Sequence, residues 1–158
     1  LDRTVGGPPF HDVKTYENSG TTFYQPLDVL PASANRRTVY RFSPRGERNA
    51  VLETFDCPDP SAQTPRRQTT TTPLQALALW NDAFVLRSAE RLADRVTADC
   101  QRAGETSTTR LVNRAYRLAI GRDPTADEAK PAAALVEKHG LKALGRVLFN
   151  CSEFVVIE

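Results

Sequence analysis

The chain has 158 residues, of which 40% are hydrophobic and 25% charged, and its formal net charge at pH 7 is +2. These are ordinary values for a soluble globular domain, and the length is sufficient to bury a core. The small net charge argues against a global field that would draw the protein to nucleic acid or to a membrane surface. Every apolar run is far shorter than the ~20 residues that a transmembrane helix needs, so we expect no membrane span.

The first ten residues, LDRTVGGPPF, lack both an initiator methionine and the layout of a signal peptide. We therefore interpret the chain as a piece of a longer protein. The three cysteines, Cys57, Cys100 and Cys151, show neither Cys-x-x-Cys nor Cys-x-x-Cys-His spacing, which argues against a zinc knuckle or covalent haem attachment. We expect no metal and no cofactor in this fragment. The sequence leaves open whether one disulfide forms or all three thiols are free.

Residues 1–35 carry no sustained helical or strand period, because glycines and prolines interrupt them. They are predicted to form an extended arm, with residues 21–24 as a short strand candidate. Aromatic side chains within the arm are expected to attach it to a core: Phe10, Tyr16, Phe23 and Tyr24.

Residues 36–42, RRTVYRF, alternate between two kinds of side chain. Thr38, Tyr40 and Phe42 fall on one face of a period-2 pattern, and the opposite face carries arginines, so the segment predicts a half-buried strand. Residues 50–55 are a second apolar stretch that fits either a strand or a single helical turn. A polar, proline-rich loop then extends to about residue 71.

Helix signals dominate from Thr72 onward. Thr72, Pro73 and Gln75 are suited to the N-cap, N1 and N3 positions of a capping box. Asn81 or Asp82 is expected to cap a second helix reaching about residue 100, and Ser107 or Thr108 a third that stops at Gly121. A capping box at residues 125–128 opens a fourth helix, which Pro131 should kink or delay, and Gly140 separates it from a fifth. Residues 154–157 are predicted to be a strand or an apolar strap.

The expected architecture is mainly α: a four- or five-helix bundle-like domain with an extended N-terminal arm and a small β element. We divide it into an arm at residues 1–35 and a single domain at 36–158. Within that domain, a strand and a clasp loop occupy residues 36–71 and the helices occupy residues 72–151.

Two carboxylates are the catalytic candidates. Asp56 and Asp59 flank Cys57-Pro58, and paired carboxylates can divide acid and base roles or bind a hard cation. Aspartate beside proline also accepts backbone N–H groups in turns, which is the structural alternative. Cys57 is a nucleophile candidate if Arg66 or Arg67 lowers its pKa and His11 or His139 acts as base, and otherwise an unreactive thiol.

Arginines near this loop are the binding candidates, because guanidinium groups bind carboxylate, phosphate or sulfate and an aromatic ring can stack on a sugar. The alternative is that the arginines pair internally with nearby acids such as Glu47, Glu53, Asp56 and Asp59. The predicted binding residues are Arg37, Arg41, Arg66, Arg67 and Tyr40.

Five segments together resemble a known family: RRTVYRF at 36–42, LETFDCPDPSAQTPRR at 52–67, TTTTPLQALALWNDAFV at 69–85, AYRLAIGRDPTADE at 115–128 and VLFNCSEF at 147–154. They are similar to the C-terminal part of an uncharacterised domain family typical of planctomycetes and related bacteria. That family closes large exported proteins that often carry a cytochrome-c-like module. The resemblance implies an extracytoplasmic location and further N-terminal sequence. It is compatible with haem in that N-terminal part, and it implies no activity. Pro131 and Cys151 depart from the family pattern.

Two functions follow as hypotheses. The first is a non-catalytic structural or binding module of a larger exported protein, facing other domains of the same polypeptide or an acidic glycan. The second is a carbohydrate-active hydrolase that uses Asp56 and Asp59.

Overall fold

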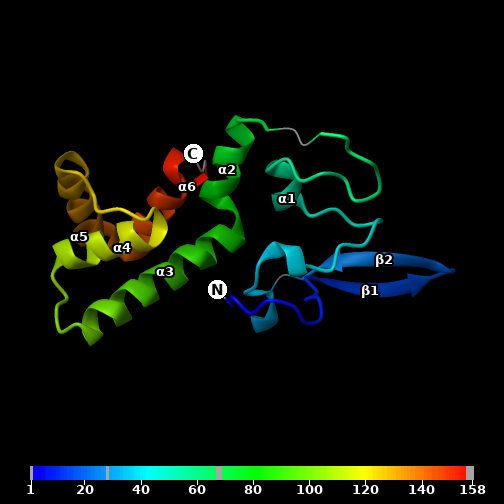
Figure 1. Ribbon diagram of the computed structural model, residues 1–158, viewed down its shortest axis with the longest axis horizontal. Coiled ribbons are helices and arrows are strands. Elements are labelled where there is room, and N and C mark those ends of the chain that lie inside the picture. The colour runs from blue at the N-terminus through cyan, green and yellow to red at the C-terminus, as the bar shows by residue number, and fades with distance from the viewer. Residues whose placement is uncertain (1, 28, 67–68, 156–158) are drawn as a thin grey trace. The chain divides into compact units, whose positions relative to one another are not determined.

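The computed structural model describes residues 2–27, 29–66 and 69–155. The chain divides into two compact units, Leu1–Thr70 and Thr71–Glu158. In Figure 1 the first unit runs from blue to green and contains the only sheet of the described residues, and the second consists of helices α2 to α6. The prediction of a mainly α protein with a small β element is confirmed. The division between the units falls at the end of the loop predicted for residues 36–71, whereas a single domain over 36–158 stays a prediction.

The first unit begins with a β-hairpin. Strands β1 (Val13–Asn18) and β2 (Thr21–Pro26) pair antiparallel, with Asn18 opposite Thr21. Ser19 and Gly20 form the two-residue turn, and both have positive φ, 51° and 77°, as the tightest hairpin turns require. The strand predicted at residues 21–24 is therefore confirmed, but its partner β1 was missed and much of the predicted arm is a hairpin.

The strand predicted over residues 36–42 is wrong. Residues Thr38–Tyr40 form a 3-10 helix, η2, after a first one, η1, at Ala32–Ala34. Its backbone pairing with the N-terminal residues consists of isolated bridges, Asp2 with Arg36 and Phe10 with Arg41. Alternation over seven residues did not yield a strand because no continuous strand lies beside the segment to pair with it.

Residues 50–55, for which strand and helical turn were both open, form the short helix α1 (Ala50–Thr54). Asn49 is its N-cap and accepts a hydrogen bond from the Leu52 N–H. The helix ends in a Schellman motif. The N–H of Asp56 donates to Glu53 O and the N–H of Cys57 to Leu52 O, and Asp56 occupies the left-handed position with φ 60°.

The second unit follows the predicted helix boundaries closely. Helix α2 (Pro73–Asn81) begins with the Thr72 capping box, and α3 (Ala83–Arg102) begins at the Asp82 cap. Helix α4 (Thr108–Ala119) is capped by Ser107, and α5 (Ala126–Phe149) opens with the capping box of Thr125 and Glu128. A short helix, α6 (Ser152–Val155), follows, so the predicted strand is wrong at residues 154 and 155, and residues 156 and 157 lie outside the described residues.

Helix α5 is interrupted at Gly140 rather than at Pro131. Gly140 has φ 80°, so the predicted fourth and fifth helices are the two parts of α5 on either side of it. Pro131 lies inside the first part with helical backbone angles, and the helix already begins at Ala126. The predicted delay and kink at Pro131 are therefore wrong, and the bend belongs to the glycine that can adopt a left-handed conformation.

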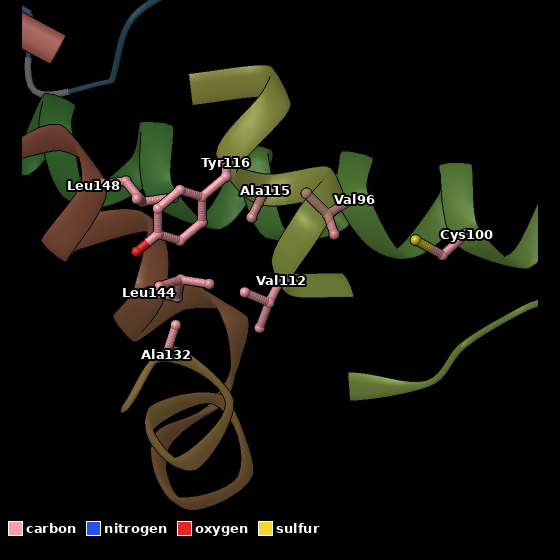
Figure 2. Packing of buried hydrophobic residues seen from close by; sticks show 8 residues of the cluster. All are labelled: Val96, Cys100, Val112, Ala115, Tyr116, Ala132, Leu144 and Leu148. Carbon is pink, nitrogen blue, oxygen red and sulfur yellow. The ribbon is translucent and has the colours of Figure 1, made fainter. Parts of the chain in front are cut away.

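The core of the second unit is made by α3, α4 and α5. Leu148 and Val96 are completely buried, and Leu144 and Val112 are 1% exposed. Figure 2 shows the side chains of this core converging from the three helices, with the Tyr116 ring of α4 among them. Gly145 permits close approach of α5 to α3, because a Cβ atom there would lie 3.3 Å from the Cβ of Ala89. No helix in the described part of the chain is long and apolar enough to cross a membrane.

Candidate functional site

Asp56 holds the end of its loop. Its carboxylate accepts hydrogen bonds from the backbone N–H of Thr70 at 2.6 Å and from the Thr70 hydroxyl at 2.8 Å. Its backbone N–H is also engaged, in the turn that ends α1. Asp56 thus closes the loop to Thr70, which is 14 positions further along the chain. Its side chain and its main chain are both used structurally.

Asp59 is engaged in a turn of its own and in an ion pair. Its carboxylate accepts from the Ser61 N–H at 2.8 Å and the Ser61 hydroxyl at 2.6 Å, and it pairs with Arg48. Hydrogen bonds from Ser61, with Arg48 adding attraction, lower the pKa of Asp59 below its ordinary value. A carboxylate with a lowered pKa is ionised at neutral pH and is not poised to donate a proton.

Tyr40, a predicted stacking residue, makes contacts within the protein through both its hydroxyl group and its ring. Its hydroxyl accepts from the Gly6 N–H at 2.9 Å, and the Arg36 guanidinium lies 4.2 Å from the centre of its ring. The same guanidinium donates to Pro8 O at 2.9 Å and to Gly6 O. Together, Arg36 and Tyr40 fasten the N-terminal residues to residues 36–42.

Arg41 lies at the centre of a buried ion-pair cluster. It donates to Asp12 at 2.6 Å and to Glu47 at 2.5 Å, and the side chains of the three residues are 5–10% exposed. Asn49 also donates to Asp12, at 3.2 Å. Desolvation opposes the charge on Arg41, but the hydrogen bonds with Asp12 and Glu47 outweigh it and raise the pKa of Arg41. The charge of Arg41 is therefore paired within the first unit, and a binding role for this residue stays a prediction.

The remaining predicted residues do not converge on one site. Arg37 and Arg66 are exposed and have no ion pair within the described ranges, and Arg67 lies outside the described residues. A small cavity of about 30 Å³ lies between Arg41, Arg48 and Cys57. His11 contacts the ring of Phe42 at 4.5 Å between ring centroids rather than a second titratable group.

The remaining candidates are the cysteines and any cluster of metal-binding side chains. The three cysteines, all within the described ranges, are free. No group of three or more His, Cys, Asp or Glu side chains that could hold a metal ion occurs among the residues the structure describes. The roles predicted for Asp56, Asp59 and the arginines remain predictions, and the structure adds that both carboxylates already have protein partners.

A second feature, which the sequence analysis missed, lies entirely within the helical unit. A groove of about 310 Å³ lies between α3 and α4, and Cys100 and Asn113 are part of its lining. Its charged lining residues are five arginines and one aspartate: Arg95, Asp99, Arg102, Arg110, Arg114 and Arg117. The Asp99 side chain, 11% exposed, accepts from Arg95 at 2.9 Å and Arg114 at 2.5 Å and also pairs with Arg102. The hydrogen bond from Arg114, ahead of the other contacts, lowers the pKa of Asp99.

The spacing of these arginines was available in the sequence. Arg110, Arg114 and Arg117 recur at intervals of four and three, which puts them on one face of a helix. Arg95 and Arg102 flank Asp99 by four and three residues on the preceding helix. The pairing of the two faces depends on how α3 packs against α4, which the sequence pattern does not contain.

The fold and these two sets of charged side chains define a class: a mainly helical module with structurally engaged acids in its first unit and an arginine-rich groove in its second. The chain belongs to a family described as a protein of unknown function (DUF1553), whose model matches residues 1–136. No curated protein matches the chain, and no solved structure matches it. The family match supports the resemblance to an uncharacterised domain family.

Proposed function

We propose that this chain is a non-catalytic structural or binding module of a larger exported protein. The observation that supports it most is the engagement of both candidate catalytic carboxylates by their own loop, Asp56 with Thr70 and Asp59 with Ser61 and Arg48. A glycoside hydrolase needs two carboxyl groups free to face the scissile bond, one of them with a raised pKa. Asp59, whose pKa is lowered, is unsuited to the general-acid role of such a pair.

The partners that we propose are other domains of the same polypeptide and an acidic ligand such as an acidic glycan, and not nucleic acid. The small net charge of +2 argues against nucleic acid, whereas clustered arginines favour discrete anionic groups. The extracytoplasmic location and the planctomycete-type context are proposals that rest on the resemblance of residues 52–85 and neighbouring segments. Any haem would belong to another part of the polypeptide, because the chain contains no Cys-x-x-Cys-His motif.

The catalytic alternative is tested with Asp56→Asn and Asp59→Asn. The purified wild-type chain is incubated with a panel of aryl glycosides, and its thermal unfolding is recorded with and without Mg²⁺ and Ca²⁺. We expect no turnover and no stabilisation by metal. Both variants should lower the unfolding temperature, because they weaken loop hydrogen bonds.

Turnover that is lost in either variant while its circular dichroism spectrum is unchanged would contradict the proposal. So would a metal-dependent stabilisation that disappears in Asp56→Asn. Location and haem are tested separately on the full polypeptide, by cell fractionation and by its visible absorption spectrum.

A further inference from the structure

The arginine groove of the second unit carries more positive charge than its own acids neutralise. Asp99 is a single negative charge shared by the three guanidinium groups of Arg95, Arg102 and Arg114. Arg110 lies 3.8 Å from Glu105, and Arg117 forms a two-point pair with Asp123 at 2.5 and 2.6 Å. The five arginines thus pair with three carboxylates, those of Asp99, Glu105 and Asp123. This leaves an excess of two positive charges at the groove.

Hydrogen-bond donors are also in excess. A guanidinium has five N–H groups, and Asp99 accepts from Arg95 only through Nε. It accepts from Arg114 through Nε and one Nη atom, so each of these side chains retains donors that the groove does not satisfy. Arg95 is 61% exposed and Arg114 35% exposed, so these donors are accessible from solvent.

Asp99 also arranges the arginines. Because its side chain is nearly buried and contacts arginines from both helices, it holds guanidinium groups of like charge close together before any ligand arrives. Preorganisation of this kind reduces the entropy lost when a ligand is bound. A planar guanidinium forms two parallel hydrogen bonds with phosphate or carboxylate oxygens, which lysine does not.

We propose that the groove between α3 and α4 binds a tetrahedral oxyanion with two negative charges, the phosphate group of a phosphate monoester. Two charges match the excess at the groove, and a tetrahedral group offers three oxygens that can accept from more than one guanidinium. A volume of about 310 Å³ is at the lower end of ligand sites, so the anionic group and a small part of its carrier fit. This inference rests on the proposed binding function and names its ligand class and place.

The test measures binding by isothermal titration calorimetry at low salt and pH 8. The titrants are inorganic phosphate, inorganic sulfate, glucose 6-phosphate, glucose 6-sulfate and glucuronate. We expect saturable binding, with glucose 6-phosphate tighter than glucose 6-sulfate because it carries the second charge, and glucuronate weakest. Affinity should fall as salt is raised, since the attraction is between charges. Tightest binding by glucuronate, or no saturable binding by any titrant, overturns the proposal.

Arg95→Gln and Arg114→Gln should each weaken binding about tenfold or more, because a hydrogen bond to a charged group is lost. The matched control is Arg87→Gln, the same charge change on an exposed arginine of α3 that does not line the groove. Arg95 is the more exposed of the two test residues, so its variant is expected to fold even if Arg114→Gln does not. Equal affinity of Arg95→Gln and Arg87→Gln overturns the proposal.

These results are separable from those of the proposed function. The glycoside assay would detect catalysis by Asp56 or Asp59, and both of these residues belong to the first unit. A groove that binds no oxyanion would leave that assay unchanged and would remove only the assigned ligand.

Discussion

Single charged residues have opposite roles in the two units. In the first unit one cation, Arg41, is buried between two carboxylates. In the second, one carboxylate, Asp99, is shared among three arginines of which two are largely exposed. Burial makes the first arrangement necessary for folding, since an unpaired buried charge is costly. Exposure leaves the second arrangement free to accept an anion.

Replacing Arg41 should therefore destabilise the first unit strongly. Arg41→Met leaves Asp12 and Glu47 buried without a counter-charge, which costs about 3–5 kcal/mol. The measurement is hydrogen exchange of the Phe10 and Phe42 amides, which form the backbone bonds beside Arg41. Arg37→Met is the control, because Arg37 is exposed, and it should change stability by about 0.5 kcal/mol or less. Similar exchange rates in the two variants would argue against a structural role for Arg41.

Glu128 should make the helical unit sensitive to acid. Hydrogen bonds from Arg122, and then from the Thr125 backbone, lower the pKa of Glu128 to about 2. Its ordinary pKa is 4.5, so the ionised side chain stabilises the folded state above that pH, and this stabilisation disappears as pH falls toward 2. Glu128→Gln should have a smaller free energy of unfolding than wild type at pH 7. Between about pH 5 and pH 2, its free energy of unfolding should fall less steeply than that of wild type.

The glutamine variant isolates the charge, because glutamine can still accept from the Thr125 N–H as Gln75 does from Thr72. The measurement is urea unfolding followed by circular dichroism at several pH values. If the free energy of unfolding falls equally steeply with pH in Glu128→Gln and in wild type, other carboxylates determine the acid sensitivity.

At the level of helices, local capping chemistry decides where most elements begin. The Thr72 hydroxyl accepts from the Gln75 N–H, and the Gln75 amide accepts from the Thr72 N–H. Thr72→Ala should cost about 1 kcal/mol of the second unit's free energy of unfolding. Trp80 fluorescence during urea unfolding reports on this helix directly, since Trp80 lies within α2. Thr71→Ala, one residue before the cap, should be close to neutral.

The bend in α5 depends on a glycine. Gly140 has φ 80°, and a Cβ added to it would meet no atom within 4 Å, so only backbone strain opposes a larger residue there. Gly140→Ala should lower the free energy of unfolding by about 1–2 kcal/mol. A rise in stability measured by urea unfolding would mean that the two parts of α5 can join into one continuous helix.

Across the whole molecule, the hydrophobic core is unevenly divided. The buried hydrophobic residues of the first unit are Phe10 and Val13 among those described, whereas the cluster from Val96 to Leu148 belongs to the second. A fragment of residues 71–158 should therefore fold alone, with a helical circular dichroism spectrum and cooperative unfolding. A fragment of residues 1–70 should show little cooperativity, because burial provides most of the stabilising free energy. A non-cooperative 71–158 fragment would show that the second unit needs the first.

The parts of the fold that could be predicted were those that depend on interactions between residues close together in the sequence. The caps at Thr72, Asp82 and Thr125 are local hydrogen-bond patterns, and the structure confirms each of them. The hairpin was missed although Ser19-Gly20 is an acceptable tight turn, because the flanking strands are mostly exposed and carry no apolar alternation. The strand at 36–42 was wrong because pairing requires a partner strand.

Local signals in the amino-acid sequence were enough to establish the mainly helical class and the starts of helices α2 to α5, and to single out Asp56 and Asp59 as candidate residues. The contacts of the charged side chains, by contrast, emerged only from the folded chain. Arg41 meets Asp12 from 29 residues away, and Arg114 meets Asp99 from 15 residues away. Capping depends on neighbours in the chain, whereas ion pairs and grooves depend on which helices and loops pack together, and that packing is set by the core as a whole.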